Sequence, residues 1–320
     1  MKAIIVSQPG GPEQLQLKDL PAPTPGPGQI LVKIAASGVN FIDIYHRTGL
    51  YKSDWPASLG MEGAGVVEAV GEGVVNFKPG DRVAYAMARG SYAEYQLVPA
   101  SLAVPVPDSL DLQIAAAAML QGMTAHYLTH STFPIQAGQT VLVHAAAGGT
   151  GLLIVQIAKL LGATVIGTTS NPDKADLARR AGADHILAYA DFDNETRRLT
   201  SGKGVDAVYD SVGASTFERS LNALRPRGML VSFGQSSGPV KPIEPLLLAQ
   251  KGSLYLTRPN LAQYTADRAE LEWRARDILS WIAARKLTVQ IARSYPLASA
   301  AQAHRDLESR ATSGKLILVI

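Results

Sequence analysis

A glycine-rich turn between two apolar runs is the part of the sequence best suited to chemistry. Residues 146–151 read AAGGTG, an AxGxxG spacing whose small residues let a ligand approach the backbone. The apolar run 141–143 precedes the turn, and residues 152–161 have the apolar spacing of a helix, whose N-terminal N–H groups bind phosphate. The pattern predicts a dinucleotide site rather than a buried corner without a ligand. The predicted pyrophosphate contacts are Ala147, Gly148, Gly149, Thr150 and Gly151.

The residues after the second apolar run indicate which dinucleotide fits. In many NADH sites an acidic residue about 20 positions beyond the glycines binds the ribose 2′-hydroxyl. Thr169 and Ser170 stand there instead, and neither can be that carboxylate. Ser170 can donate a hydrogen bond to a 2′-phosphate, and Lys174 adds a cation one helical turn later. Ser170 and Lys174 therefore favour NADPH.

Two alternatives to this cofactor assignment stay open. Ser170 or Asn171 could cap a helix that begins at Pro172, which would leave Lys174 in solvent. Asp173 lies slightly late for the ribose-binding acid, but it could serve an NADH site.

The composition is typical of a two-domain enzyme. The chain has 320 residues, and 30 Lys and Arg against 27 Asp and Glu give a formal charge of +3 without a basic run. We expect a cytoplasmic protein without a membrane or nucleic-acid partner, since no segment has transmembrane length and no signal peptide is apparent. The absence of cysteine excludes disulfides, a thiolate nucleophile and cysteine-ligated metals.

The elements that must position these residues change in character along the chain. As far as about residue 122, short β-like runs alternate with turn residues and predict an irregular β domain. Strands then alternate with helices, of which 174–182 and 215–228 are the clearest. A helix at 270–284 and a final apolar run most simply return to the first domain. The predicted class is α/β, with a doubly wound parallel sheet.

The other chemistry-bearing residues match no motif. His126 and His130 are spaced i, i+4 but lack the glutamate of HExxH, so we interpret them as a packing feature. Apart from GQSSG at 234–238, which lies in a segment that we assign to cofactor binding below, no segment has the GxSxG spacing of a nucleophile elbow, and we expect no hydrolase chemistry.

Several longer motifs carry a resemblance that runs nearly from end to end. They are GVNFIDIYHRTGLY at 38–51, LGMEGAGVVEAVGEGV at 59–74, HAAAGGTG at 144–151, YDSVG at 209–213 and VSFGQSSG at 231–238. In these motifs the chain resembles the zinc-independent quinone oxidoreductases, the zeta-crystallin-like branch of the medium-chain dehydrogenase/reductase superfamily. The resemblance implies a Rossmann domain, residues 123–260, inserted in a GroES-like, mainly β catalytic domain, residues 1–122 and 261–320. It also implies NADPH as hydride donor and quinones as acceptors.

One position separates the chain from the zinc alcohol dehydrogenases of the same superfamily. Their Gly-His-Glu segment, whose histidine binds catalytic zinc, is Gly60-Met61-Glu62 here. Methionine is a poor zinc ligand, and no cysteine completes such a site. Alcohol oxidation needs a Lewis acid, whereas an electron-poor quinone needs only hydrogen-bond donors and protons. We expect no metal, and a structural role for Glu62.

The resemblance assigns four residues to the substrate pocket facing the nicotinamide, namely Asn40, Asp43, Tyr45 and Tyr51. The tyrosines offer stacking surface and an O–H for a quinone oxygen, and Asn40 could orient that donor or the carbonyl. A structural role is an equal alternative for Asp43. Asn40 and Asp43 have the spacing of a helix cap, and Asp43 could pair with Arg47 one turn on.

The resemblance and the predicted strand ends add further cofactor residues. Thr124 is similar to a residue near the nicotinamide ribose, Tyr189 to the adenosine-side tyrosine, and Arg310 to the basic residue that reaches the 2′-phosphate. Thr124 could instead begin a helix, and Tyr189 and Arg310 could be surface residues. The carboxyl ends of two predicted strands supply Ser211, Phe233, Gly234 and Ser236.

Residues 253–259, SLYLTRP, alternate like an edge strand, and the resemblance implies that this strand forms the interface of a homodimer.

Three functions remain as interpretations of the sequence. The first is an NADPH:quinone reductase. The second is an NADPH-dependent reductase of α,β-unsaturated aldehydes or ketones. The third is a non-enzymatic NADPH- and RNA-binding protein, since zeta-crystallin-like proteins also serve as lens proteins and bind AU-rich RNA, although the even charge does not support it.

Overall fold

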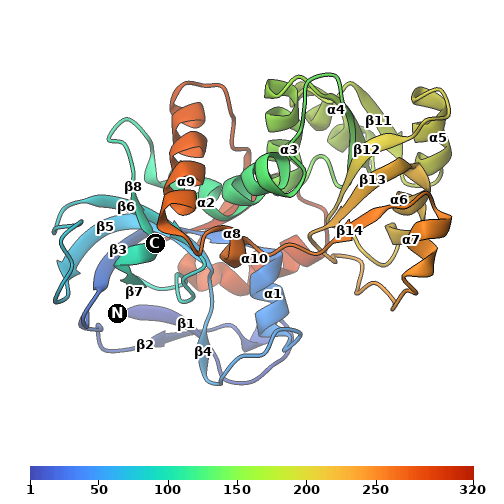
Figure 1. The fold of residues 1–320 in the computed structure, drawn as a ribbon. Helices are drawn as coiled ribbons and strands as arrows, with labels where there is room; N and C mark the ends of the chain where they lie inside the picture. Colours follow the sequence, from blue (N-terminus) through green and yellow to red (C-terminus); the bar gives the residue numbers. More distant parts are fainter. The chain divides into compact units, whose positions relative to one another are not determined.

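Two large sheets of opposite character organise the chain, and each belongs to a separate compact unit. The computed structural model describes residues 1–320. The first unit comprises residues 1–123 and 264–320, and the second comprises residues 124–263 (Figure 1). The second unit is thus one continuous stretch, whereas the first is assembled from two.

The first unit is built on a mainly antiparallel seven-stranded sheet in the order β15-β16-β3-β5-β6-β8, with β7 paired to β3. A three-stranded sheet has the order β2-β1-β4. The strands are Lys2–Val6 (β1), Gln16–Asp19 (β2), Gln29–Val39 (β3), Ala57–Ser58 (β4), Glu62–Val70 (β5), Arg82–Ala86 (β6), Tyr95–Pro99 (β7), Ala103–Pro105 (β8), Ile291–Pro296 (β15) and Lys315–Val319 (β16).

The long strand β3 gives this unit its core because its apolar side chains alternate with more exposed ones. Ile30, Val32 and Ile34 lie in a buried cluster with Val67 of β5 and Val83 of β6. At about 25 cal/mol per Å² of buried apolar surface, each such side chain contributes about 2 kcal/mol.

The pairing of β3 brings three distant chain segments to one corner. One edge of β3 pairs with β5, and its other edge is shared, with 29–33 paired to β7 and 36–39 paired to β16. The last residues of β3 therefore lie between the first residues of β5 and β16. This corner holds the polar network described below.

Helices connect and flank these strands. Helix α1, Phe41–Arg47, follows β3 directly, and α9, Arg268–Ala283, is the expected amphipathic helix. Helix α10 is Ala300–Glu308, while α2, Leu112–Tyr127, and α8, Leu261–Tyr264, cross the boundaries of the two units. Short 3-10 turns occupy Pro12–Gln14, Ala100–Leu102 and Leu297–Ser299. A π-helical turn occupies Leu128–Thr132. None of the helices combines the length and apolar character needed to cross a membrane.

The second unit is a six-stranded, all-parallel sheet in the order β11-β10-β9-β12-β13-β14. Helices α3 and α4 lie on one side of the strands and α5 and α6 on the other (Figure 1). The strands are Thr140–Val143 (β9), Thr164–Thr169 (β10), His185–Ala188 (β11), Val205–Asp210 (β12), Leu224–Ser232 (β13) and Tyr255–Thr257 (β14). The helices are Gly149–Leu160 (α3), Pro172–Arg180 (α4), Phe192–Leu199 (α5), Phe217–Ala223 (α6) and Leu246–Gln250 (α7).

The strand order reverses between β9 and β12, since the chain runs outward from β9 to β11 and then returns to the other side of β9. Ligands of doubly wound folds bind at such a switch point, outside the carboxyl ends of the strands. The predicted doubly wound sheet is therefore confirmed.

One predicted helix is shorter than expected. Residues 215–228 were predicted to be helical, whereas α6 ends at Ala223 and β13 begins at Leu224. Pro226 explains the early end, because proline cannot donate to a helix interior and it disfavours helical geometry in the residue before it.

Candidate active site

Helix α1 starts with the contact that its sequence predicts for a cap. Asp43 Oδ2 accepts a 2.8 Å hydrogen bond from the Asn40 N–H, so the acid three residues into the helix holds its first residue. Asp43 is fully buried. The alternative pairing of Asp43 with Arg47 does not occur, because Arg47 binds Glu308 instead.

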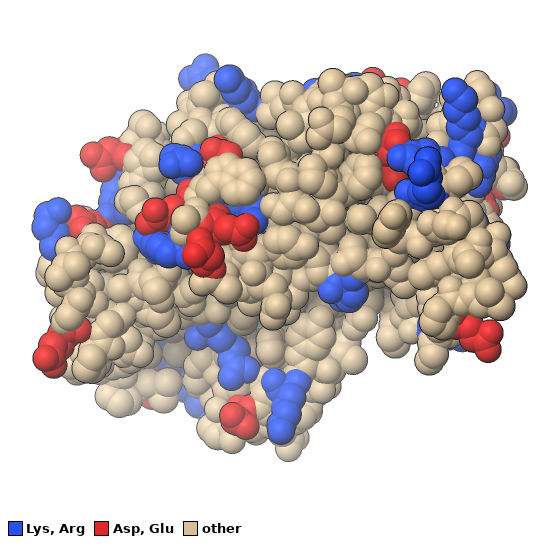
Figure 2. Space-filling model, viewed as in Figure 1, with Lys and Arg blue, Asp and Glu red and all other residues tan.

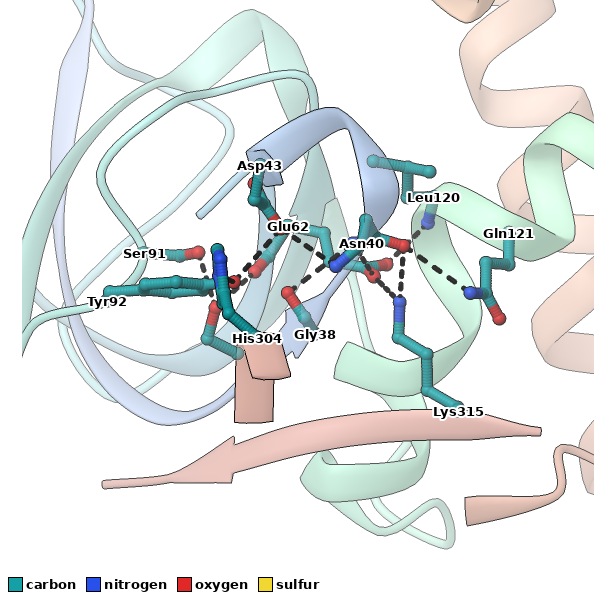
Figure 3. Close-up of polar contacts among 11 residues, drawn as sticks. Gly38, Asn40, Asp43, Glu62, Ser91, Tyr92, Leu120, Gln121, His304 and Lys315 are labelled. Atoms are coloured by element: carbon teal, nitrogen blue, oxygen red, sulfur yellow. Dashed lines mark hydrogen bonds and ion pairs between the residues drawn. The ribbon is translucent and has the colours of Figure 1, made fainter. Parts of the chain in front are cut away.

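The side-chain amide of Asn40 is engaged within the protein (Figure 3). Its Nδ2 donates to Glu62 Oε1 at 2.7 Å, and its Oδ1 accepts from Lys315 Nζ at 2.6 Å. Gln121 Nε2 lies 3.5 Å from the same oxygen. Asn40 is 4% exposed, so its amide acts here as a link between a buried acid and a buried base.

The acid and the base form a buried ion pair. Lys315 Nζ contacts Glu62 Oε1, and the other carboxylate oxygen, Oε2, accepts the backbone N–H of Leu120 at 2.6 Å. Both side chains are at most 1% exposed. Glu62 therefore has the structural role expected of it. Lys315 was not predicted, and the only signal for it is a lysine placed directly before the apolar run LILVI.

A second chain of buried contacts leads from Asp43 through Tyr92 and His304 to Arg47. Arg47 can only donate, so the 3.1 Å contact between its Nη1 and His304 Nδ1 makes that nitrogen an acceptor. His304 then carries its proton on Nε2, which donates to Tyr92 Oη at 3.1 Å, and the Tyr92 hydroxyl donates to Asp43 Oδ2 at 3.0 Å. All these donors point toward Asp43.

Burial sets the protonation of this chain. Burial raises the pKa of Asp43 from 3.8 to about 7, although the Asn40 N–H and the Tyr92 hydroxyl oppose the rise. The other oxygen of this carboxyl, Oδ1, is buried without a hydrogen-bond partner. Burial, with a smaller contribution from Arg47, lowers the pKa of His304 to about 3, so His304 is neutral at neutral pH.

The two tyrosines of the predicted substrate set lie together and apart from this polar interior. The ring centroids of Tyr45 and Tyr51 are 5.3 Å apart at 61°, and the Tyr51 N–H donates to the Tyr45 carbonyl oxygen at 3.0 Å. Both side chains are half-buried. The structure thus divides the set into two buried residues, Asn40 and Asp43, and two that remain partly accessible.

In the second unit, the glycine turn directly precedes α3. Gly148 is its N-cap residue, and Gly148, Gly149 and Thr150 are partly exposed, while Ala147 is buried. A side chain on Gly151 would meet the Ala145 carbonyl oxygen at 2.2 Å. Gly151 therefore lets the helix pack on the turn. The Gly148 N–H donates to the Ala145 carbonyl oxygen at 2.8 Å, so Gly149 and Thr150 are the residues whose N–H groups lack helical partners.

A buried network beneath the turn escaped the sequence analysis. Ser220 Oγ donates to Asp210 Oδ2 at 3.0 Å and lies 2.9 Å from His144 Nε2, while Thr168 Oγ1 lies 2.9 Å from His144 Nδ1. Asp210 Oδ1 also accepts the N–H groups of Val212 and Gly213. Burial lowers the pKa of His144 to about 4, so the ring is neutral. This network ties the loop after β9 to the loop after β12.

Several predicted cofactor residues gather at the carboxyl ends of these strands. The Ala145 N–H donates to Tyr189 Oη at 2.9 Å, which connects the end of β11 to the turn. The Ser236 N–H donates to the Ser211 carbonyl oxygen at 3.1 Å. A side chain on Gly234 would meet that same oxygen at 2.7 Å. Phe233, which is half-buried, follows β13 directly.

The remaining predicted cofactor residues are more dispersed. Asn171, rather than Ser170, is the N-cap residue of α4, because its Oδ1 accepts the Lys174 N–H at 3.0 Å. Ser170 is exposed at the end of β10. Thr124 is buried within α2, and Arg310 is exposed just after α10, in the first unit.

The sequence and the fold have clear relatives. A quinone oxidoreductase of Pseudomonas aeruginosa is 46% identical over 315 residues, which are 97% of this chain and 97% of that protein. The chain belongs to the quinone oxidoreductases of the medium-chain dehydrogenase/reductase superfamily. The family descriptions that match are "Alcohol dehydrogenase GroES-like domain" over residues 26–108 and "Zinc-binding dehydrogenase" over residues 149–267.

Two further relatives match over all or nearly all of the chain. The crystal structure of an Escherichia coli quinone oxidoreductase complexed with NADPH has a TM-score of 0.98, with 43% identity over 100% of both chains. A 2-haloacrylate reductase of a Burkholderia species is 42% identical over 99% of this chain and 98% of that protein.

The residues of this family member do not fit a catalytic zinc, despite the name of the matching description. Met61 is buried and is a poor ligand for zinc, and its neighbour Glu62 is committed to Lys315. The structure contains no group of three or more His, Cys, Asp or Glu side chains that could hold a metal ion. The rings of His126 and His130 stack 4.2 Å apart, as expected of a packing pair.

Proposed function

We propose that this quinone oxidoreductase reduces quinones with NADPH. In this proposal the second unit binds NADPH, and the first unit supplies the pocket for the quinone. The observation that carries the proposal is the glycine turn at the switch point of a six-stranded parallel sheet. The relative from E. coli was crystallised with NADPH. NADPH supplies a hydride when bound, and one proton completes the reduction of a quinone to a hydroquinone.

We assign the cofactor contacts to residues 123–260 and to Arg310 of the first unit. The N–H groups of Gly149 and Thr150 would bind the pyrophosphate, while the small residues Ala147, Gly148 and Gly151 let it approach the backbone. Ser170, Lys174 and Arg310 would bind the 2′-phosphate. The nicotinamide and adenosine portions would contact Thr124, Tyr189, Ser211, Phe233, Gly234 and Ser236.

We assign the quinone contacts to Tyr45 and Tyr51. Their rings are partly accessible and form an edge-to-face pair, which offers an aromatic wall and O–H donors to a flat carbonyl compound. Asn40 and Asp43 hold the start of α1, which positions Tyr45, and they do so through the buried contacts with Glu62, Lys315 and Tyr92.

A second acceptor class is favoured by one finding. The Burkholderia relative is a 2-haloacrylate reductase at 42% identity. Its named substrate has a carbon–carbon double bond conjugated to a carbonyl group. Reduction of such activated double bonds in the same pocket is therefore the alternative activity.

We further propose a homodimer formed through β14. This strand ends the parallel sheet, and Tyr255 and Leu256 are 58% and 36% exposed. An exposed edge strand with apolar side chains pairs readily with a second copy of itself. The pairing would join two six-stranded sheets.

Steady-state oxidation of NADPH and NADH by the metal-free protein tests the proposal. The acceptors are 1,4-benzoquinone, an unsaturated ketone and a blank without acceptor. We expect rapid turnover of NADPH with the quinone. Turnover with the ketone alone would establish the alternative, and turnover that requires added zinc would overturn the assignment of the pocket.

The variant Tyr51→Phe tests the acceptor pocket because it keeps the ring and removes the O–H. We expect kcat/KM for benzoquinone to fall about 100-fold, the size expected for one lost donor at the reacting carbonyl. Tyr295→Phe, a hydroxyl removed elsewhere in the first unit, is the matched control. Equal activity of Tyr51→Phe and wild type would remove Tyr51 from the pocket.

A further inference from the structure

The guanidinium of Arg89 is connected to Tyr51 through the side chains of Ser53 and His46. Arg89 is exposed in the segment between β6 and β7, and its Nη1 donates a 2.8 Å hydrogen bond to Ser53 Oγ. The Ser53 hydroxyl oxygen lies 3.0 Å from His46 Nδ1. The ring of His46 packs edge-on against Tyr51, with centroids 5.6 Å apart at 81°.

The backbone that carries Arg89 is held on both sides. The Met87 N–H donates to the Met61 carbonyl oxygen at 2.7 Å, and the Gly90 N–H donates to the Gly60 carbonyl oxygen at 2.8 Å. Met87 has a φ of 65°, a conformation that such surrounding contacts must maintain. Arg89 is thus presented from an ordered platform even though its side chain is exposed.

The direction of the hydrogen bonds follows from the arginine. A guanidinium only donates, so Ser53 Oγ accepts from Arg89 and its own proton is available to His46 Nδ1. Burial and the charge of Arg89 both lower the pKa of His46. The imidazole is therefore neutral at neutral pH, and when Ser53 donates to its Nδ1 it carries its proton on Nε2, which makes it a further donor beside Tyr51.

The charge of Arg89 is not neutralised by the protein. Arg89 makes its one side-chain contact with the neutral Ser53 and forms no ion pair in this structure. This differs from Arg47 and Arg274, whose guanidinium groups are buried against carboxylates. An unpaired guanidinium binds carboxylate or sulfonate groups well, because its planar donors match their oxygen atoms.

We propose that Arg89, Ser53 and His46 form an anion-binding rim beside Tyr51, and that the chain prefers acceptors that carry a carboxylate or sulfonate next to the reducible group. The proposal rests on the proposed function only in placing the acceptor at Tyr45 and Tyr51. The rim binds the anionic substituent, and the tyrosines contact the ring.

Turnover of two matched quinones tests the rim. We compare kcat/KM for 1,2-naphthoquinone-4-sulfonate and for neutral 1,2-naphthoquinone in wild type, Arg89→Gln and Arg89→Lys, with Arg276→Gln as a control that removes a charge from the exposed face of α9. We expect Arg89→Gln to lower the value for the sulfonate about 10-fold and to leave the neutral quinone within about twofold. Arg89→Lys should retain most of the preference, and added salt should weaken it. Equal effects of Arg89→Gln on both quinones, or no effect, would overturn the rim.

Binding of unreactive analogues separates the rim from the proposed function. We measure the affinity of 2-naphthoate and of neutral 2-naphthamide by calorimetry with the same variants. Weaker binding of 2-naphthoate alone in Arg89→Gln supports the rim, even if no quinone is reduced, in which case only the proposed function fails. Equal binding of 2-naphthoate by wild type and Arg89→Gln overturns the rim, whatever the quinone activity.

Discussion

The pair formed by Lys315 and Glu62 is the residue-scale feature on which the corner beneath α1 depends. Both charges are fully buried, and Asn40 connects them. Withdrawing two charges from water is costly, so such a pair is tolerated only when both partners are present and hydrogen-bonded. The consequence is an asymmetry between removing one charge and removing both.

Replacing Lys315 with methionine tests this asymmetry. Lys315→Met leaves Glu62 buried without its cation, and we expect the free energy of unfolding to fall by about 3–5 kcal/mol. The double variant Lys315→Met/Glu62→Gln should recover part of the loss. All three tryptophans, Trp55, Trp273 and Trp281, lie in the first unit, so urea unfolding followed by fluorescence reports on this unit. Lys286→Met, an exposed change, is the control, and a Lys315→Met variant as stable as that control would contradict the expectation.

Asp43 gives the first unit a stability that depends on pH. Its pKa is raised from 3.8 to about 7 in the folded protein, so the folded state holds the proton more tightly than the unfolded state. The resulting stabilisation is fully present below the ordinary pKa of aspartate and is lost as the pH rises toward the folded pKa. A shift of this size corresponds to about 4 kcal/mol. His304 acts in the opposite direction, because its pKa is lowered to about 3 and its contribution is lost on acidification.

The variant Asp43→Asn isolates the contribution of Asp43, since His304 is present in both proteins. We expect the stability of the variant relative to wild type to rise by up to about 4 kcal/mol as the pH increases from about 4 to 7 and to stay constant above. Any lost contact of the amide shifts this difference equally at every pH. Urea unfolding at a series of pH values measures it, and a difference that does not change with pH would show that Asp43 titrates normally.

At the corner beneath α1, the sequence could predict the contact between residues close in sequence but not the contacts between residues far apart in sequence. Asn40 and Asp43 are three residues apart, so their spacing alone indicates the cap contact that the structure contains. Lys315 is 275 positions from Asn40, and only the pairing of β16 with the end of β3 brings it there. The network of His144, Ser220 and Asp210 was missed for the same reason, since three strands and a helix must assemble before these side chains meet.

At the scale of elements, the start of α4 contains both a helix cap and residues that we propose for cofactor binding. Asn171 caps the helix, whereas Ser170 is exposed and Lys174 is half-buried in its first turn. The two sequence interpretations of this segment are therefore compatible. Asn171 serves the helix, and Ser170 and Lys174 are the residues that we propose for the 2′-phosphate.

Three variants of this segment test that division. Asn171→Ala should lower the stability of the second unit by about 1 kcal/mol and leave the ratio of NADPH to NADH affinities unchanged. Ser170→Ala and Lys174→Gln should reduce that ratio, by about 10-fold for the lysine, with little effect on stability. Circular dichroism and titration of both nucleotides provide the measurements. A variant Lys174→Gln with an unaltered ratio would place the 2′-phosphate elsewhere.

The strand and helix pattern of the second unit could be predicted because each βα step is local in sequence. Apolar strands such as 205–210 and the glycine turn are recognisable one at a time, and a parallel sheet follows from their alternation with helices. The first unit could be predicted only as irregular β structure. Its central strand β3 has three partners, and no periodicity within β3 indicates where along its edge β7 ends and β16 begins.

At the scale of the whole molecule, the exposed edge of the second unit bears on assembly. Lysine and arginine side chains are scattered among uncharged surface on the face drawn in Figure 2, without a continuous basic band. That face offers no support for RNA binding. The apolar residues of β14 are a better basis for a partner, and the proposed partner is a second copy of the chain.

The variant Leu256→Lys tests the dimer because a charge on an edge strand opposes pairing with its own copy. We expect light scattering at micromolar concentration to give a mass near twice 33.9 kDa for wild type and near 33.9 kDa for the variant. Leu160→Lys, a change at another exposed apolar position of the second unit, is the control. A mass near 33.9 kDa for the wild-type protein would show that β14 does not form a dimer interface.

The position of β16 between β15 and β3 has a consequence for how the protein is made. A ribosome releases the second unit as one uninterrupted stretch, which can fold while synthesis continues. The first unit cannot complete its fold at that time, because the strand that pairs with the end of β3, residues 315–319, and the cation that pairs with Glu62, Lys315, have not yet been synthesised. The edge of β3 at residues 36–39 therefore stays without its partner strand until residues 315–319 have been synthesised.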